Sequence, residues 1–300
     1  MMRGQTTMAS SVRKSSGEIV TEVKEYIPVA KRKKIFGLPF IRGSVNMIES
    51  MIVGVKVLMD SAEQIEFEEA EPESKFEKWL EKKLGSEKAF TIMLYCSVVF
   101  ALVLGIGLFM LLPNIVADFI PINKETTAGS FYANILEGII RIVFFLLYVY
   151  LVSKNKDIRR VFQYHGAEHK TIYAYENMEE LTVENVKKHT TLHPRCGTTF
   201  IFVVIILSII IFAFAGWYSR LVNMLIRLAL LPVIAGISYE VFKLAARSNS
   251  KLVKLISLPG ILLQKLTTKE PDDSMIEVAI ASLKAVLDKE EAEEAAKQAV

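Results

Sequence analysis

The sequence contains only two cysteines, Cys96 and Cys196, among its 300 residues. Cys96 lies within an apolar stretch, whereas Cys196 lies at the end of a polar segment, just before the apolar stretch at 199–217. We therefore expect no disulfide between them in a reducing compartment. The first twenty residues lack an apolar segment, which excludes a cleavable signal peptide. The net charge is only +3 at pH 7, and this surplus is too small to indicate a nucleic-acid partner.

Apolar residues, in contrast, make up 52% of the chain. They are grouped in long runs, which argues against an ordinary soluble domain. A membrane crossing needs about 20 mostly apolar residues, and four stretches qualify: residues 89–112, 131–152, 199–217 and 221–243. We therefore expect a mainly α fold, a polytopic α-helical membrane protein with four transmembrane helices in a domain at 89–243.

Basic residues fall on one side of these predicted spans. They gather before the first span, between the second and third, and after the fourth, whereas the loops around 113–130 and 217–220 offer only Lys124 and Arg220. Short basic loops are retained in the cytoplasm, so both termini and the loop 153–198 are expected to be cytoplasmic. The basic run at 31–34 is expected to lie against anionic head groups of the lipid bilayer.

The segments outside the spans have patterns of their own. Residues 7–28 alternate around a turn at Gly17 and predict a hairpin in a small cytoplasmic β-element at 1–40. Residues 41–62 predict an amphipathic interfacial helix within a region at 41–88, followed by a linker at 64–74 and a short helix at 75–84. In the last region, 244–300, we expect an interfacial or re-entrant piece at 252–266 and a charged helix whose acidic run at 290–294 is solvated.

All four histidines lie between positions 165 and 193, and Cys196 follows closely. A helix over 158–175 would put His165, Glu168 and His169 on one face. Thr182 is a plausible N-cap for a second helix that runs to about His193, where Pro194 forbids continuation. His189 and His193 would then also lie one turn apart, so that two histidine pairs face each other.

The first pair has the His-x-x-Glu-His spacing of inverted zinc-hydrolase helices, in which the glutamate takes a proton from water. Glu168 is therefore the candidate base, and His165, His169, His193 and Cys196 are the candidate ligands of Zn²⁺ or another divalent transition metal. Four protein ligands would make a closed, structural site, and three ligands with water would make a catalytic one, with Cys196 either a ligand or a neighbour of the ligands. The third alternative is that the cluster binds no metal. His189 is a ligand, a proton carrier or a solvent-facing residue.

Ionisable residues also occur within the predicted spans, where they are costly enough to be functional candidates. Glu137 and Arg141, one turn apart, predict a salt bridge that Arg227 could join. Glu240, near the cytoplasmic end of the fourth span, could reach the metal or pair with a basic residue such as Lys243. Two loop residues, Lys170 and Arg195, could bind an anionic group or serve only as determinants of topology.

Several blocks resemble the bacterial YqhQ-like family of unknown function. The resemblance covers nearly the whole chain and implies a metal-dependent enzyme of the bacterial cytoplasmic (inner) membrane. Family members carry a glycine-rich stretch before the first block, which implies a longer N-terminus. The blocks are Met1-Met-Arg-Gly4, Arg42-Gly43, Arg160-Val-Phe-Gln-Tyr-His-Gly-Ala-Glu-His-Lys170, Leu192-His-Pro-Arg-Cys-Gly-Thr198, Ala235-Gly-Ile-Ser-Tyr-Glu240 and Leu266-Thr-Thr-Lys-Glu-Pro-Asp-Asp273.

The function that these patterns predict is a metal-dependent hydrolase at the cytoplasmic face, acting on a membrane-associated substrate, either lipid or membrane protein. The alternative is a non-enzymatic scaffold or transporter in which the metal only locks the loop. Pro232 and Gly236 in the fourth span would suit a broken transport helix or a tolerated kink. Four spans could form a pathway only as a homo-oligomer.

Overall fold

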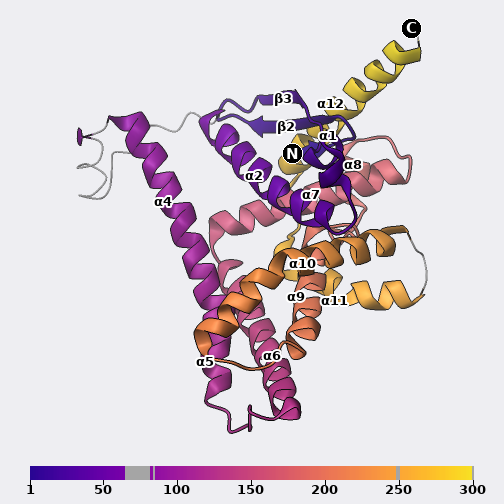
Figure 1. Ribbon diagram of the computed structural model, residues 1–300. Helices are drawn as coiled ribbons and strands as arrows, with labels where there is room; N and C mark the ends of the chain where they lie inside the picture. Colours follow the sequence, from indigo (N-terminus) through magenta and orange to yellow (C-terminus); the bar gives the residue numbers. More distant parts are fainter. Residues whose placement is uncertain (65–81, 84, 248–250, 299–300) are drawn as a thin grey trace. The chain divides into compact units, whose positions relative to one another are not determined.

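A computed structural model describes residues 1–64, 82–83, 85–247 and 251–298 (Figure 1). The chain separates into two compact units, the first made of Met1–Glu66, Leu147–Ile211 and Ala229–Val300, and the second of Phe67–Leu146 and Phe212–Leu228. The elements are β1 (Met2–Arg3), β2 (Thr7–Arg13), β3 (Ile19–Glu25), α1 (Val29–Arg32), η1 (Lys34–Gly37), α2 (Ile41–Gln64), α4 (Ser86–Ile106), η2 (Gly107–Leu111), α5 (Leu112–Asp118), α6 (Thr127–Val152), α7 (Lys156–Glu176), α8 (Val183–Lys187), α9 (Gly197–Ala213), α10 (Arg220–Arg247), α11 (Lys251–Thr267) and α12 (Asp273–Gln298).

The predicted hairpin is confirmed as strands β2 and β3, which pair antiparallel with Ser11 opposite Thr21. Gly17 in the connecting turn has φ +87°, a conformation that favours glycine. The short strand β1 adds a third, antiparallel strand at the β2 edge, which the sequence did not reveal. Successive residues of β2 point to opposite faces, so Ala9 packs towards α12 while Met8 packs towards α2.

Helix α12 is both the predicted charged tail and part of the core of the first unit. Its buried residues pack with residues of β1, β2, α7 and α8, as Figure 1 illustrates for the helix lying along the sheet. The acidic run at its end is not simply solvated, because Glu290 accepts hydrogen bonds from the backbone of Gln5 and Thr6 at 2.5 and 3.1 Å. The prediction of a solvated run was therefore wrong for Glu290. The core residues of α12 are Met275, Ile276, Ala279, Ile280, Leu283 and Val286.

Two further predicted segments are helical in the structure, and two others lie largely outside the described residues. The helix expected over 41–62 is confirmed as α2, and the piece expected over 252–266 forms the helix α11, with Pro259 inside it. The predicted linker at 64–74 and most of the short helix at 75–84 fall outside the described residues.

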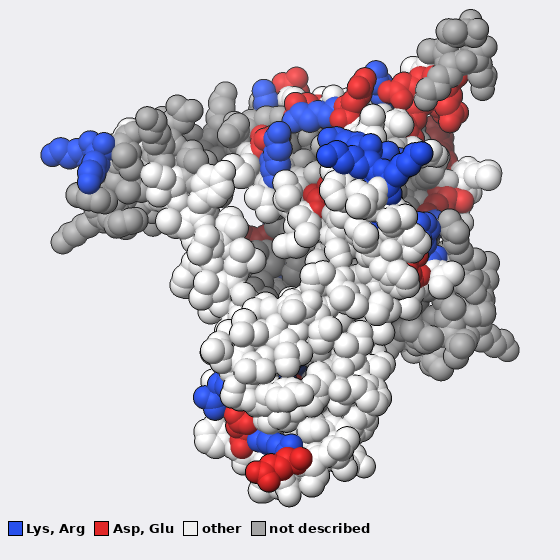
Figure 2. All heavy atoms as spheres, in the orientation of Figure 1, with Lys and Arg blue, Asp and Glu red and all other residues white. Residues whose placement is uncertain are grey.

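Three helices are long and apolar enough to cross a membrane: Tyr95–Asp118, Thr127–Val152 and Arg220–Leu244. The third predicted span, 199–217, is not among them: it corresponds to α9, which has 17 residues. At 1.5 Å per residue this helix is about 26 Å long, slightly less than the roughly 30 Å of a hydrocarbon core. Figure 2 shows few charged side chains over the apolar helices on the face in view, and a small group of them in the region where Figure 1 places the turn between α5 and α6. The chain is thus mainly helical, with a small sheet and at least three candidate spans in its described part.

The second unit encloses the predicted ionisable pair. Glu137 accepts from Arg141 at 2.6 Å and lies 2.5 Å from Arg227, so one carboxylate faces two guanidinium groups. Asn114 donates to the same carboxylate at 2.9 Å, and Asn134 accepts from Arg227 at 3.1 Å. All five side chains are buried. The predicted salt bridge and the contribution of Arg227 are confirmed in geometry.

A short π-helical segment, η2, completes this network. Within η2 the backbone leaves the α-helical hydrogen-bond pattern, and the carbonyl of Phe109 accepts from Arg141 Nε at 2.9 Å. Such π-bulges release backbone groups for other partners. The guanidinium of Arg141 therefore has both a carboxylate and a carbonyl partner inside an otherwise apolar unit.

Candidate metal centre

Helix α7 carries the first histidine pair. Asn155 caps its N-terminus by accepting from the backbone of Asp157 and Ile158 at 2.8 and 3.2 Å. The helix runs through Glu176, so His165 and His169 lie one turn apart, as predicted. Their ring centroids are 4.4 Å apart. Both side chains point towards Cys196, which immediately precedes α9 in the same compact unit.

Each of these two histidines is oriented by a backbone carbonyl. His165 Nδ1 lies 3.0 Å from the Thr267 carbonyl, and His169 Nδ1 lies 2.5 Å from the Thr191 carbonyl. A carbonyl oxygen only accepts, so each Nδ1 must carry the proton. Each Nε2 can then act as a ligand once a metal displaces any proton that it shares with the Cys196 sulfur, which is the usual arrangement behind a metal-bound histidine.

Cys196 supplies the third donor atom. Its Sγ lies 3.2 Å from His165 Nε2 and 3.2 Å from the Thr198 hydroxyl. Burial opposes ionisation of the Cys196 thiol, but hydrogen bonds from His165 and His169 outweigh burial and lower its pKa to about 5. Burial also works against a charged His165, yet contact with Cys196 raises the pKa of that imidazole. At neutral pH the sulfur is therefore a thiolate, the form that binds metals.

The donor atoms of His165, His169 and Cys196 all lie within 4.8 Å of one another. In a tetrahedral zinc site, bonds of about 2.0–2.3 Å keep neighbouring donors roughly 3.3–3.6 Å apart. The cluster is therefore close to the required spacing, and two nitrogens with one thiolate suit Zn²⁺. The described residues fit a three-ligand site that leaves a fourth position for another group.

The second predicted helix is shorter than expected. Thr182 does cap it, accepting from the backbone of Asn185 at 3.3 Å, but α8 ends at Lys187. Side chains of α7 bond to carbonyls of the segment 187–192: Lys170 to Lys187, His169 to Thr191, and Tyr173 to Leu192. These bonds hold the segment 187–192 against α7, and this segment is not helical beyond Lys187.

The expected second histidine pair is therefore wrong, because His189 and His193 do not share a helical face. His189 Nε2 lies 3.2 Å from Glu179, and its ring stacks on Tyr173, away from the donor group. His193 stays close, with its ring centroid 5.7 Å from that of His169. Its Nε2 is buried without a hydrogen-bond partner in the described part of the chain, and lies 3.5 Å from Glu176.

Gln264 fixes the loop that carries His193, a role that the sequence did not suggest. Its fully buried amide accepts from the His193 backbone at 2.7 Å and donates to the His193 carbonyl at 2.8 Å. The same amide donates to Thr199 at 3.0 Å. Only the adjacent block at 266–273 hinted that this region matters.

Glu168, the predicted base, is half-buried and outside the donor group. It makes no hydrogen bond to any described residue, although its charge favours protonation of His165. Glu176 is better connected than the sequence implied, since one oxygen accepts from Arg195 and the other faces His193. Two glutamates of α7 are thus candidates for moving a proton.

The other predicted binding residues already have partners. Lys170 is buried and donates to Glu270, and Arg195 pairs with Glu176, so neither cation presents a free charge to a ligand. Glu240 accepts from Arg42 Nε at 2.7 Å and Arg42 Nη2 at 2.5 Å. Of the two alternatives for Glu240, pairing with a basic residue is therefore confirmed, but the partner is Arg42 rather than Lys243.

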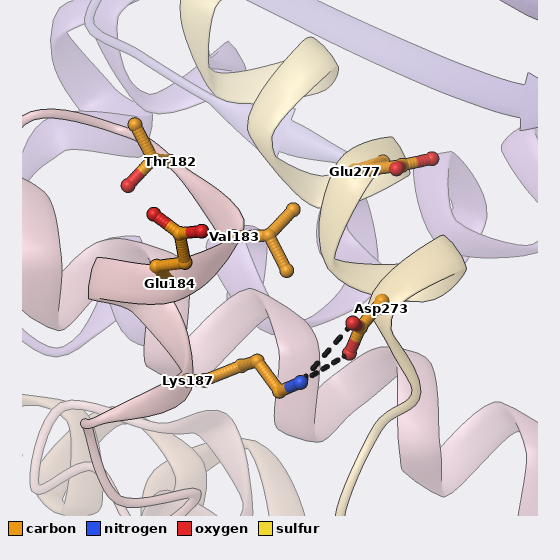
Figure 3. Close-up of a pocket in the computed structure, with 6 residues that line it drawn as sticks. All are labelled: Thr182, Val183, Glu184, Lys187, Asp273 and Glu277. Atoms are coloured by element: carbon orange, nitrogen blue, oxygen red, sulfur yellow. Dashed lines mark hydrogen bonds and ion pairs between the residues drawn. The ribbon is translucent and has the colours of Figure 1, made fainter.

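A hollow of about 490 Å³ between α8 and α12 lies apart from this cluster (Figure 3). Its side chains include Lys187, which points at Asp273 and lies 2.8 Å from the carboxylate. Glu277 on the same helix is bound by Arg13. None of the cluster residues lines this hollow, so the candidate chemistry does not use it.

Gly166 lets the chain that orients His165 approach α7 closely. A Cβ at this position would lie 2.1 Å from the carbonyl oxygen of Lys269. The backbone N–H of Lys269 donates to the Phe162 carbonyl on α7, which holds the two segments together. Gly166→Ala should therefore push the 267–269 segment away, costing about 1–3 kcal/mol and loosening the contact between His165 and Thr267. The measurement is the thermal midpoint together with bound metal per chain.

Gly197→Ala is the matched control, because a Cβ there meets nothing within 4 Å. It should leave both quantities near the wild-type values. Equal effects of the two substitutions would show that the close approach at Gly166 has no special role.

Two comparisons with known proteins show the family to which the chain belongs. Residues 38–289 match the family described as a protein of unknown function, DUF1385. The chain is also 33% identical over 291 residues to the uncharacterized protein YqhQ of Bacillus subtilis (strain 168), covering 96% of this chain and 89% of that protein. No solved structure matches. The chain belongs to this YqhQ-like family of unknown function.

Proposed function

We propose that the chain is a metal-dependent hydrolase of the bacterial cytoplasmic membrane, with Zn²⁺ or another divalent transition metal held by His165, His169 and Cys196. Its substrate is membrane-associated, a lipid or a membrane protein. The observation that carries this proposal is the orientation of both histidines, whose Nδ1 atoms bond to carbonyls while their Nε2 atoms face a thiolate. This is how proteins prepare imidazoles for a metal.

A zinc ion bound there would lower the pKa of a coordinated water to about 7, which makes hydroxide available for hydrolysis. The protein must then take up and return one proton. Glu168 is one candidate for this task, because it lies beside His169 on α7 and acts electrostatically on His165. The pair formed by His193 and Glu176 is the other, since the His193 ring lies next to that of His169.

The membrane arrangement that we propose has four crossings, with both termini and the metal centre in the cytoplasm. Basic residues precede α9 and follow α10, which favours the cytoplasmic side of the membrane for both the start of α9 and the end of α10. If α10 crosses, α9 must cross as well. Its length of 17 residues is sufficient if the bilayer thins locally, at a modest cost.

Complementation of a deletion strain tests the function. The strain should accumulate one class of lipid or membrane protein that the wild-type gene removes, as measured by lipid and membrane-protein profiling. Cys196→Ser should fail to complement, because it loses a ligand. Of Glu168→Gln and Glu176→Gln, the variant that removes the base should fail while retaining metal.

The alternative is a structural metal in a non-enzymatic scaffold or transporter. The position of His193 favours it, because its ring centroid lies 5.7 Å from that of His169. Nδ1 of His193 accepts from the Arg195 backbone, so a small movement of the ring together with a shift of its proton to Nδ1 would supply Nε2 as a fourth ligand and close the site. In that case both glutamine variants complement, whereas Cys196→Ser and His193→Ala lose metal together.

A further inference from the structure

A second hollow, of about 540 Å³, lies in the first unit between the segment around α1 and η1, helix α2 and the end of α10. It is lined by none of the metal-centre residues. Figure 2 shows Lys and Arg side chains gathered in the region where Figure 1 places α1. The hollow is therefore part of a basic surface.

The charge of the lining is strongly one-sided. Its ionisable residues are Arg3, Lys31, Arg42 and Lys243, with no acidic residue among the lining. Arg42 is neutralised by its two-point contact with Glu240. The other three cations have no carboxylate within 4.0 Å among the residues described, so the hollow keeps a surplus of positive charge.

Arg3 and Lys31 are held near this position by weak local contacts. The guanidinium of Arg3 lies 3.9 Å from the ring centroid of Tyr26, and Lys31 Nζ lies 3.4 Å from the Gln5 carbonyl. Neither contact cancels the charge. An anion with several oxygens could therefore bridge these groups and Lys243, as a phosphate does.

The uncharged lining specifies the ligand further. Ser50 and Tyr239 offer hydroxyl groups that can donate to phosphate oxygens. The Oδ1 atom of Asn46 is buried and has no hydrogen-bond partner in the described part of the chain. Asn46 also lines the hollow, so a small turn of its side chain would bring this acceptor to a ligand that carries a donor, such as a hydroxyl, as well as the anion.

We propose that this hollow is a binding site for a hydroxyl-bearing phosphate ester of the glycerol phosphate type. Arg3, Lys31 and Lys243 bind the phosphate, and Asn46 accepts from the hydroxyl. This chemistry is found both in the head group of phosphatidylglycerol and in free glycerol phosphate. The site does not depend on the proposed hydrolase activity.

The test uses the purified full-length chain and two probes. Free glycerol phosphate is titrated into detergent-solubilised protein by calorimetry, and phosphatidylglycerol is compared with phosphatidylcholine in nanodiscs by native mass spectrometry. Saturable binding of free glycerol phosphate identifies a soluble source. Retention of phosphatidylglycerol alone identifies the lipid. In either case inorganic phosphate should displace the probe from the wild-type protein.

The double substitution Lys31→Gln with Lys243→Gln should weaken probe binding about 10- to 30-fold, because each lysine beside a bound anion strengthens binding by about three- to fivefold. Lys33→Gln with Lys34→Gln is the matched control, because it removes two charges from the same basic segment without touching the lining. It should change binding less than about twofold. Equal weakening by both pairs, or no binding of either probe to the wild-type protein, overturns the proposal.

Discussion

Cys196→Ser should weaken the binding of transition metal to the purified protein at least about 100-fold. Loss of a residue that merely orients a ligand costs 10- to 100-fold in metal affinity, and loss of the thiolate itself should cost more. The Cys196 pKa of about 5 adds a pH dependence, because the thiolate is available at neutral pH and is protonated as the pH falls below that value. The affinity of the wild-type protein for metal should thus fall as the pH is lowered, first because His165, whose pKa is raised, takes up a proton and then because Cys196 does, as measured by elemental analysis after dialysis at each pH.

Cys96→Ser is the control for this substitution. Cys96 is an exposed free thiol on α4 and makes no contribution to the donor group, so its loss should leave metal content unchanged. His193→Ala separates the two forms of the site, since an open centre keeps its metal in this variant. Unchanged metal content in Cys196→Ser would contradict the ligand set.

Glu137→Gln should destabilise the protein by about 3–5 kcal/mol, the cost of breaking a buried charge pair. The substitution leaves Arg141 and Arg227 buried with no carboxylate between them. For a chain of this size that loss corresponds to a fall of roughly 6–20 °C in thermal midpoint. The measurement is thermal unfolding of the detergent-solubilised protein.

Glu125→Gln, in the exposed turn between α5 and α6, removes the same charge without burial and should change the midpoint little. A triple replacement of Glu137, Arg141 and Arg227 by leucine should restore much of the stability, because removing a whole buried ion group is often neutral. A triple variant as unstable as Glu137→Gln would indicate that shape, rather than unpaired charge, sets the cost.

The elements that the sequence predicted well are those with one dominant pattern of apolar residues. The hairpin, α2, α7 and the long apolar helices follow from alternation, amphipathicity or continuous hydrophobicity. Two elements were misjudged because tertiary contacts decide them. Helix α8 ends at Lys187, and the segment after it is held against α7 by side-chain bonds to its carbonyls. Helix α12 is core as well as charged tail because its apolar residues meet a sheet far away in sequence.

The metal centre was predictable in part for a similar reason. The spacing of His165 and His169 on a helix is a local property, so their shared face could be read from the sequence. The position of Cys196 depends on the turn before α9, and the orientation of each imidazole depends on the carbonyls of Thr191 and Thr267. Those contacts are between distant segments and leave no local pattern. The same holds for Asn114 and Asn134 in the second unit. Both are uncharged residues in or beside apolar runs, and no local pattern indicates that they bond to Glu137 and Arg227.

The most direct measurement of the central claim is X-ray absorption at the metal edge of the purified wild-type protein, combined with metal per chain. The account predicts about one transition-metal ion per chain, bound by one sulfur, two imidazoles and one further oxygen, which is the open tetrahedral set. Absence of a stoichiometric metal, or a shell without sulfur, would contradict the metal centre. A third imidazole in place of the oxygen would contradict the open, catalytic form.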